Sequence, residues 1–177
     1  MEHTFRMLLN HAELQAVRDI VNSVWPPTFR EILSPEQITF MMKMMYAPEV
    51  MERELDEGIY FEILSLDGED AGFISYGRYE GQPETVKLHK CYLLEKFQGQ
   101  GHGSAMLRHA ALAARQMGAK YLRLNVNKHN EKAIRAYQRN GYVTVESVKN
   151  DIGNGSAHCL LSLDCGCKST AFSNTIS

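Results

Sequence analysis

The chain has 177 residues, of which 44% are hydrophobic and 23% charged, and its formal net charge is −2. This size and composition are typical of one globular domain with a substantial core. No apolar run reaches the roughly 18 residues of a membrane-spanning helix, and the N-terminus lacks the apolar segment of a signal peptide. The four cysteines match no disulfide or zinc spacing, because Cys165-Gly166-Cys167 supplies only two ligands. We therefore predict a reduced, cytoplasmic protein that binds no metal, membrane or nucleic acid.

Charge is distributed unevenly along the chain. Between Arg30 and Asp70 only Arg30, Lys43 and Arg53 are basic, and the acidic residues are Glu31, Glu36, Glu49, Glu52, Glu54, Asp56, Glu57, Glu62, Asp67, Glu69 and Asp70. Between Lys87 and Lys149 the balance is reversed, with twelve Lys or Arg against three Glu. A basic half suits an anionic cofactor and an acidic half suits a cationic substrate. Two solvated faces explain the pattern equally well.

The first 58 residues predict a short strand over 4–9 and three helices. Asn10 opens the first helix, and Trp25-Pro26-Pro27-Thr28-Phe29 is expected to break it. Ser34-Pro35-Glu36-Gln37 has the N-cap and first-turn proline of a second helix, whose methionine-rich face we interpret as core rather than as a pocket lining. Residues 48–58 are expected to form a third helix that ends at Gly58.

From Ile59 the hydrophobic period changes to two. Residues 59–66 and 71–77 flank Asp67-Gly68, a strong hairpin signal, and the turn at 80–83 leads into a strand over 86–94. These connections predict three consecutive antiparallel strands. Strict alternation in the third strand places Val86, Leu88, Lys90 and Tyr92 on one face and Lys87, His89, Cys91 and Leu93 on the other.

Glycines at 99, 101 and 103 separate this strand from a helix that ends at Gly118. Glycines allow close backbone approach to a ligand, and a helix N-terminus attracts anions, so the segment predicts a phosphate cradle. It is not a nucleoside-triphosphate loop, which needs a lysine after the last glycine, nor a dinucleotide fingerprint, whose third glycine comes one residue later. Further elements follow: a strand over 121–126 parallel to the previous one, a helix over 131–139 between Asn130 and Gly141, and a final strand pair over 142–149 and 158–163.

Gln98-Gly99-Gln100-Gly101-His102-Gly103 resembles the Q/R-x-x-G-x-G/A signature of the GNAT superfamily of acetyl-CoA-dependent N-acetyltransferases. Residues 87–97 resemble its splayed fourth strand, and residues 125–142 its N-x-x-A-x-x-x-Y-x-x-x-G-F/Y motif. The resemblance spans about residues 4–164 and implies an α+β fold of three layers. This fold is a mixed, mostly antiparallel twisted sheet with one parallel splayed pair and helices on both faces. We expect one domain over residues 1–164 and a flexible tail over 165–177.

The resemblance implies that acetyl-CoA is the co-substrate and that a primary amine attacks it directly, through a tetrahedral intermediate. Main-chain groups from the cradle would bind its pyrophosphate: Gln98, Gly99, Gln100, Gly101, His102, Gly103 and Ser104. Those of Tyr92, Leu93 and Leu94 would bind the pantetheine arm and the oxyanion. Asn130 would contact the reactive end, and Tyr137 would protonate the leaving thiolate, since a phenol with a pKa of about 10 stays protonated at neutral pH. A core tyrosine and a plain N-cap are the alternatives at these two positions.

The general base stays open: His89 is one candidate, and Glu31, Glu62, Asp151 and water are its rivals. The chain also resembles bacterial spermine/spermidine-type acetyltransferases, which implies a polyamine acceptor near Trp25, Phe29 and Glu31. Residues 156–159 lack the acidic side chains expected for that subgroup. Other options are a protein lysine or N-terminal acetyltransferase, an enzyme for an aminoglycoside-like or other small amine, and a non-catalytic CoA sensor. A homodimer through the final strands is a further expectation from the resemblance.

Overall fold

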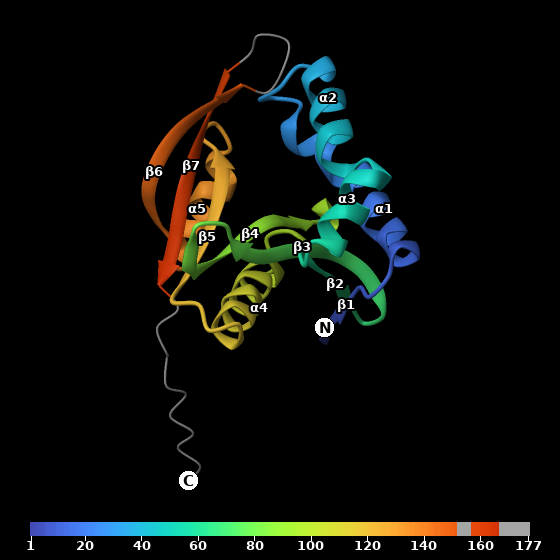
Figure 1. Ribbon diagram of the computed structural model, residues 1–177. Coiled ribbons are helices and arrows are strands. Elements are labelled where there is room, and N and C mark those ends of the chain that lie inside the picture. Colours follow the sequence, from blue (N-terminus) through green and yellow to red (C-terminus); the bar gives the residue numbers. More distant parts are fainter. Residues whose placement is uncertain (152–156, 167–177) are drawn as a thin grey trace.

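The structure is a computed structural model that describes residues 1–151 and 157–166 (Figure 1). Along the chain lie β1 (His3–Met7), the 3₁₀ turn η1 (His11–Glu13), α1 (Leu14–Phe29), α2 (Pro35–Tyr46), α3 (Pro48–Asp56), β2 (Tyr60–Leu66), β3 (Glu69–Tyr79), β4 (Gln82–Leu93), the 3₁₀ turn η2 (Glu95–Phe97), α4 (His102–Gln116), β5 (Tyr121–Asn127), α5 (Glu131–Arg139), β6 (Val143–Asp151) and β7 (Ala157–Gly166). Strand β7 passes the expected domain end at residue 164. The loop 152–156 and the tail 167–177 lie outside the described residues.

The strands of the described chain form one sheet in the order β1-β2-β3-β4-β5-β7-β6. Neighbouring strands are antiparallel except β4 and β5, which pair in parallel. The connections explain the difference: tight turns join β2, β3 and β4, whereas α4 carries the chain from β4 to β5. The predicted mostly antiparallel sheet with one parallel pair is confirmed.

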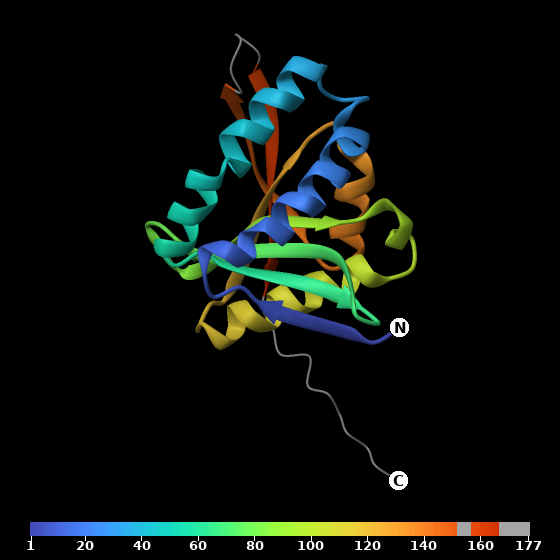
Figure 2. The same cartoon turned by 90° about the vertical axis from the view of Figure 1, so that its right-hand side faces the viewer.

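Helices cover both faces of the sheet (Figures 1 and 2). Helices α1, α2 and α3 pack on one face and form with β2 and β3 what we call the helical-layer core. Helix α4 covers the other face and forms the α4-side core, against which α5 packs through Ala133, Ile134 and Tyr137. The predicted three-layer arrangement is therefore confirmed, and each face of the sheet buries an apolar surface.

The prolines of α1 do not end the helix, so the predicted break is wrong. The helix spans Leu14–Phe29 with Pro26 and Pro27 in its last turn. Proline removes a main-chain donor, but its fixed φ is itself helical. The final turn also buries Trp25 and Phe29, which are only 3% and 7% exposed. Burial of these two large aromatic side chains offsets the lost hydrogen bonds.

Other local signals act as predicted. The Ser34 hydroxyl accepts the Gln37 N–H at 3.2 Å while the Gln37 side chain accepts the Ser34 N–H at 3.0 Å, which completes a capping box. Asp67 and Gly68 have φ of 49° and 86°, as a two-residue hairpin turn requires. Three half-buried methionines of α2 pack against the helical-layer core: Met41, Met42 and Met45.

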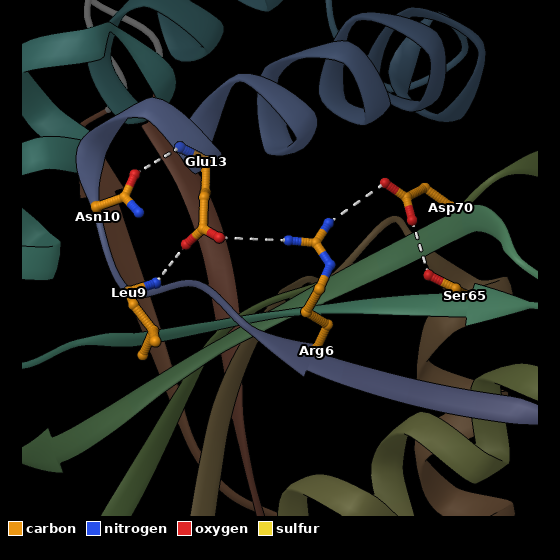
Figure 3. Close-up of polar contacts among 6 residues, drawn as sticks. All are labelled: Arg6, Leu9, Asn10, Glu13, Ser65 and Asp70. Atoms are coloured by element: carbon orange, nitrogen blue, oxygen red, sulfur yellow. Dashed lines mark hydrogen bonds and ion pairs between the residues drawn. The ribbon is translucent and has the colours of Figure 1, made fainter.

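Arg6 links the edge strand β1 to two neighbouring segments (Figure 3). Its guanidinium lies 3.9 Å from the Glu13 carboxylate and 3.7 Å from that of Asp70. Glu13 also accepts the Leu9 N–H at 2.6 Å, and Asp70 accepts the Ser65 hydroxyl at 2.7 Å. The start of the helical layer is thus tied to the β2–β3 hairpin by polar contacts that occupy both carboxylates.

Candidate functional site

Strands β4 and β5 diverge halfway along their length. Their parallel ladder covers only Thr85–Leu88 and Tyr121–Leu124. Beyond it, β4 continues to pair with β3 as far as Leu93, and β5 with β7 as far as Asn127. The β5-facing edge of β4 therefore has no ladder partner after Leu88 within the described chain. An extended ligand with amide groups can hydrogen-bond to such an edge as an added strand.

A β-bulge marks the start of this divergence. Leu88 pairs with Tyr76 and Lys90 pairs with Ser75, so His89 is the extra residue on β4. Bulges bend a strand and occur often beside active sites. The bulge thus turns β4 away from β5 at the residue where their pairing stops.

The bulge also changes which side chains share a face of β4. Strict alternation placed Leu88 together with Lys90 and Tyr92. In the structure Leu88 packs in the α4-side core with Cys91 and Leu93, whereas Lys90 and Tyr92 contact the helical layer. The predicted alternation is wrong across the bulge, because one extra residue shifts the phase of every side chain that follows.

The glycine segment forms an open loop that leads into α4. Gly99 and Gly101 have φ of 75° and 87°, in the left-handed region that favours glycine. Gly101 is the N-cap of α4 without a side-chain hydrogen bond, and the first intrahelical bond runs from the Ala105 N–H to the Gly101 carbonyl. Apart from the adjoining residues and the backbone of α4 itself, no atom of the described chain lies within 4 Å of where a Cβ would stand on Gly99, Gly101 or Gly103. The loop therefore offers unpaired N–H groups and free space to an anion.

Side chains of the loop hold its shape. The Gln98 amide donates to the Leu93 carbonyl at 2.9 Å and accepts from Lys132 Nζ at 2.6 Å, which joins the end of β4 to α5. Ser104 Oγ accepts from the Asn140 amide at 3.0 Å. Because the side chains of Gln98 and Ser104 are used in these contacts, the main chain is the part of the loop available to a ligand.

Two basic side chains of the loop have protein partners. His102 is 7% exposed, and its Nδ1 lies 2.8 Å from Nε2 of His3 on β1. Lys96 pairs with Glu69. The His102 side chain is therefore buried against β1 and not solvated.

Tyr137 on α5 packs against the α4-side core, with its ring centroid 5.8 Å from that of Tyr142. Burial raises the pKa of the Tyr137 phenol well above its ordinary value, and the neighbouring Cys91 thiol and Tyr92 phenol raise it further. The phenol is thus protonated at neutral pH, as a proton donor must be. Asn130 caps α5 by accepting the Ala133 N–H at 3.2 Å, so the capping role is confirmed.

Two reactive side chains on β4 are held neutral. Burial raises the pKa of the Cys91 thiol to about 12, so Cys91 carries no thiolate at neutral pH. Burial, with the nearby Lys87 and Lys90 charges, lowers the pKa of His89 to about 4. His89 Nε2 is also buried without a hydrogen-bond partner among the described residues. The imidazole therefore has a free lone pair or a free N–H at neutral pH.

The residues expected to contact an acceptor have different environments. Trp25 and Phe29 are buried with their ring centroids 4.4 Å apart, and the Trp25 indole N–H donates to the Tyr46 hydroxyl at 3.1 Å. Glu31 is exposed, 3.7 Å from Arg30. The structure brings Trp25 and Phe29 together but places Glu31 at the surface.

The sequence patterns missed a buried ion pair behind β4. Lys90 Nζ lies 2.5 Å from a Glu54 carboxylate oxygen and between the rings of Tyr46 and Phe61, at 5.7 and 5.5 Å from their centroids. The one signal available was that strict alternation places Lys90 on the same face as Val86, Leu88 and Tyr92. Its partners come from α2, α3 and β2, and no local pattern relates them.

Glu62 and Asp151 are two further candidates for the general base. Glu62 is 5% exposed on the α4 side, where it accepts the Tyr76 hydroxyl and lies 2.8 Å from His109 Nε2. Burial alone would raise the pKa of Glu62, but contacts with His109 and Tyr76 lower it overall. The side chain of Asp151 lies outside the described residues. Glu62 is therefore committed to a network beneath α4.

A diverging parallel strand pair, a glycine loop at a helix N-terminus and a half-buried phenol that interacts with β4 are typical of acyltransferases that use CoA thioesters. The model of the acetyltransferase (GNAT) family matches residues 14–142. The chain belongs to this family, and acetyl-CoA is its co-substrate, as predicted. The expected enzyme class, an N-acetyltransferase, is likewise confirmed, and a non-catalytic sensor is set aside.

Relatives and solved structures agree with this assignment. An uncharacterized N-acetyltransferase in the pepI 3′ region of Lactobacillus delbrueckii subsp. lactis is 28% identical over 69% of this chain and 74% of its own length. Streptothricin acetyltransferase of Streptomyces lavendulae is 34% identical over 46% of this chain and 43% of its own. The PaiA N-acetyltransferase of Thermoplasma acidophilum, solved in complex with coenzyme A, has a TM-score of 0.75 at 20% identity and covers 94% of this chain and 99% of that one. This last similarity shows a common fold.

No helix in the described part of the chain has the length and apolar character needed to cross a bilayer.

Proposed function

We propose that the protein transfers the acetyl group of acetyl-CoA to the primary amine of a small molecule at the fork between β4 and β5. One observation carries the proposal: the edge of β4 that is open beyond Leu88 leads to the glycine loop, which Gln98 ties to Leu93 and to α5, and Tyr137 of α5 interacts with Cys91 and Tyr92 on that same stretch of β4. Each supplies a different requirement of amide formation, namely binding, alignment and protonation.

The fork and the loop fit the co-substrate. The main-chain N–H groups of residues 99–104 would hold the pyrophosphate, because the positive end of α4 and the empty space at the glycines favour an anion there. The Gln98 N–H, expected to share this role, donates instead to the Glu95 carbonyl at 3.0 Å. The main chain of Tyr92, Leu93 and Leu94 would hold the pantetheine arm along the open edge of β4. Acetyl-CoA supplies an acetyl group activated as a thioester. Asn130, at the start of α5, is proposed to contact the reactive end.

Tyr137 is proposed as the general acid. Its raised pKa keeps the hydroxyl protonated over the physiological range, so it can donate to sulfur as the thiolate leaves. Cys91, with a pKa of about 12, does not compete as a nucleophile, which supports direct attack by the amine. These two side chains thus favour direct transfer to the amine, through a tetrahedral intermediate and without an acyl-enzyme.

His89 is proposed to accept the amine proton, directly or through water. It lies at the bulge, and its neutral imidazole is available as an acceptor at neutral pH. A pKa of about 4 makes it a weak base, so its contribution is expected to be modest. Water alone is the competing explanation.

Polyamines are the first acceptor class to test, although the structure weakens the electrostatic argument for them. Most of the acidic side chains between residues 31 and 70 contact donors of this chain: Glu31, Glu52, Glu54, Asp56, Glu62, Asp67, Glu69 and Asp70. Their charges are partly neutralised, so we expect only weak attraction of a polycation. Trp25 and Phe29 are buried, so they would pack behind the wall of an acceptor site and offer the acceptor little surface. Homodimer formation through the final strands stays a prediction.

The test is release of free thiol from acetyl-CoA with matched acceptors. Spermidine, spermine, an aminoglycoside, streptothricin (the compound in the name of one relative) and lysine peptides would each be supplied at low and high salt. Release with one class, accompanied by mass-spectrometric detection of the acetylated amine, supports the proposal and names the acceptor. Polyamine turnover that does not change with salt would remove the electrostatic argument for that class. Tight CoA binding without release for any amine would contradict the proposed transfer.

A further inference from the structure

Tyr46, the last residue of α2, connects the helical layer to β4. It is 5% exposed, although no motif in the sequence distinguishes it. Its hydroxyl accepts the Trp25 indole N–H at 3.1 Å, and the two ring centroids lie 5.6 Å apart. A hydroxyl that accepts one hydrogen bond keeps its own hydrogen for a second partner. The Tyr46 hydroxyl oxygen is therefore bonded to α1, and its hydrogen remains available to a group on the sheet.

Tyr46 also contacts the part of β4 that follows the bulge. The Lys90 ammonium stands 5.7 Å from the Tyr46 ring centroid, a cation–π contact, and Phe73 of β3 packs edge-on at 6.4 Å. The phenols of Tyr46 and Tyr92 interact. Burial raises the pKa of Tyr92 to about 12, and the contact with Tyr46 opposes this rise. Tyr46 thus contacts the residues on both sides of Cys91.

Tyr92 is fixed from several directions. Its ring centroid lies 6.0 Å from that of Trp25 and 5.8 Å from that of Phe73. On β3, the Cβ that Gly72 lacks would stand 2.4 Å from the Tyr92 carbonyl, so the two main chains are in close contact. The Tyr92 phenol also raises the pKa of the Tyr137 phenol. A movement of the Tyr92 side chain would therefore change the position of the open edge of β4 and the surroundings of Tyr137, the proposed acid.

We propose that Tyr46 is a positioning residue of the transfer site: through its hydroxyl and ring it fixes Lys90 and Tyr92, and with them the edge of β4 after the bulge. The inference rests on the proposed function, since that edge is where the acetyl-CoA arm is proposed to lie. It also gives Trp25 a different role from direct acceptor contact, because the indole N–H is used to orient Tyr46. The acceptor-side helices then help to shape the co-substrate site.

The test compares Tyr46→Phe with a matched control, Tyr76→Phe. Each removes one buried hydroxyl, and Tyr76 donates to Glu62 on the α4 side of the sheet. Losing a buried hydrogen bond should lower Tm by roughly 2–4 °C in Tyr46→Phe, and by more in Tyr76→Phe, whose partner is a buried carboxylate. Only Tyr46→Phe should also raise the Kd for CoA and lower kcat/KM for acetyl-CoA, each about 10-fold, because misplacing the strand misplaces the co-substrate. The acceptor KM should be unchanged.

A second pair of variants separates positioning from acceptor contact. Trp25→Phe should act in the same direction as Tyr46→Phe, and the double variant should be no worse than the poorer single one, because both remove the same hydrogen bond. Equal CoA affinity in Tyr46→Phe and Tyr76→Phe would overturn the inference. So would a change confined to the acceptor KM. If the wild-type protein acetylates no amine, the proposed function fails, yet the CoA affinities still decide the role of Tyr46.

Discussion

Lys90 and Glu54 form an ion pair inside the protein, with 2.5 Å between the ammonium nitrogen and a carboxylate oxygen. The Lys90 side chain is 3% exposed and that of Glu54 is 23% exposed. Burial lowers the pKa of Lys90, and Glu54 opposes this by favouring the charged form. Removing a lysine from water is costly unless an anion accompanies it. The pair therefore ties α3 to β4 one residue after the bulge.

Replacing Glu54 by Gln should destabilise the protein more than replacing both partners. The single change leaves a buried ammonium without an anion, which costs about 2–3 kcal/mol after allowance for the partial exposure of Glu54. Lys90→Met combined with Glu54→Gln removes both charges and should recover at least about 1 kcal/mol of that loss. Urea unfolding of the single and double variants measures the difference. Equal destabilisation in both would show that the ion pair contributes little.

A branched side chain at Gly103 should weaken co-substrate binding without harming the fold. Gly103 has no positive φ, and no atom of the described chain outside its neighbours and the backbone of α4 lies within 4 Å of a Cβ placed on it. Gly103→Ala should leave stability equal or raise it by about 0.5–1 kcal/mol, because alanine favours a helix. Gly103→Val should raise the Kd for CoA at least about 10-fold by filling the space proposed for phosphate. Calorimetric titration with CoA, together with Tm values no lower than that of the wild type, would establish both points. Unaltered CoA affinity in Gly103→Val would place the phosphates elsewhere.

His89 should make stability sensitive to mild acid. Its folded-state pKa of about 4 lies below the ordinary value of about 6.5. Between these two values the unfolded chain binds a proton that the folded chain does not, so stability falls as pH falls through that window. His89→Asn removes this titration and should lose less stability than the wild type between pH 7 and pH 5. Glu62 also has a lowered pKa, but its effect begins below about pH 4.5. Parallel stability curves for the two proteins would contradict the assignment.

Much of the fold follows from local sequence signals. The capping box at Ser34, the hairpin at Asp67-Gly68 and the glycine loop each depend on a few adjacent residues whose preferred conformations agree with the structure. The parallel pairing of β5 follows from the helix that precedes it. These features could be predicted because neighbouring residues decide them.

What the sequence did not reveal depends on contacts between distant segments. The bulge at His89 adds one residue to a strand without any glycine or proline to mark it. The end of α1 continues through Pro26 and Pro27 because Trp25 and Phe29 are buried by other elements. Tyr46 and Glu54 acquire their partners only when α2 and α3 pack on the sheet. Tertiary packing overrides local preference at each of these positions.

The most direct test of the account is the turnover of Tyr137→Phe with the best acceptor. The change removes one hydroxyl and keeps the ring that packs in the α4-side core. We predict that kcat falls about 100-fold, because general acid catalysis is lost, while the Kd for CoA stays within about twofold. An unchanged kcat would contradict the assignment of Tyr137 as the proton donor and, with it, the placement of the reaction at the β4–β5 fork.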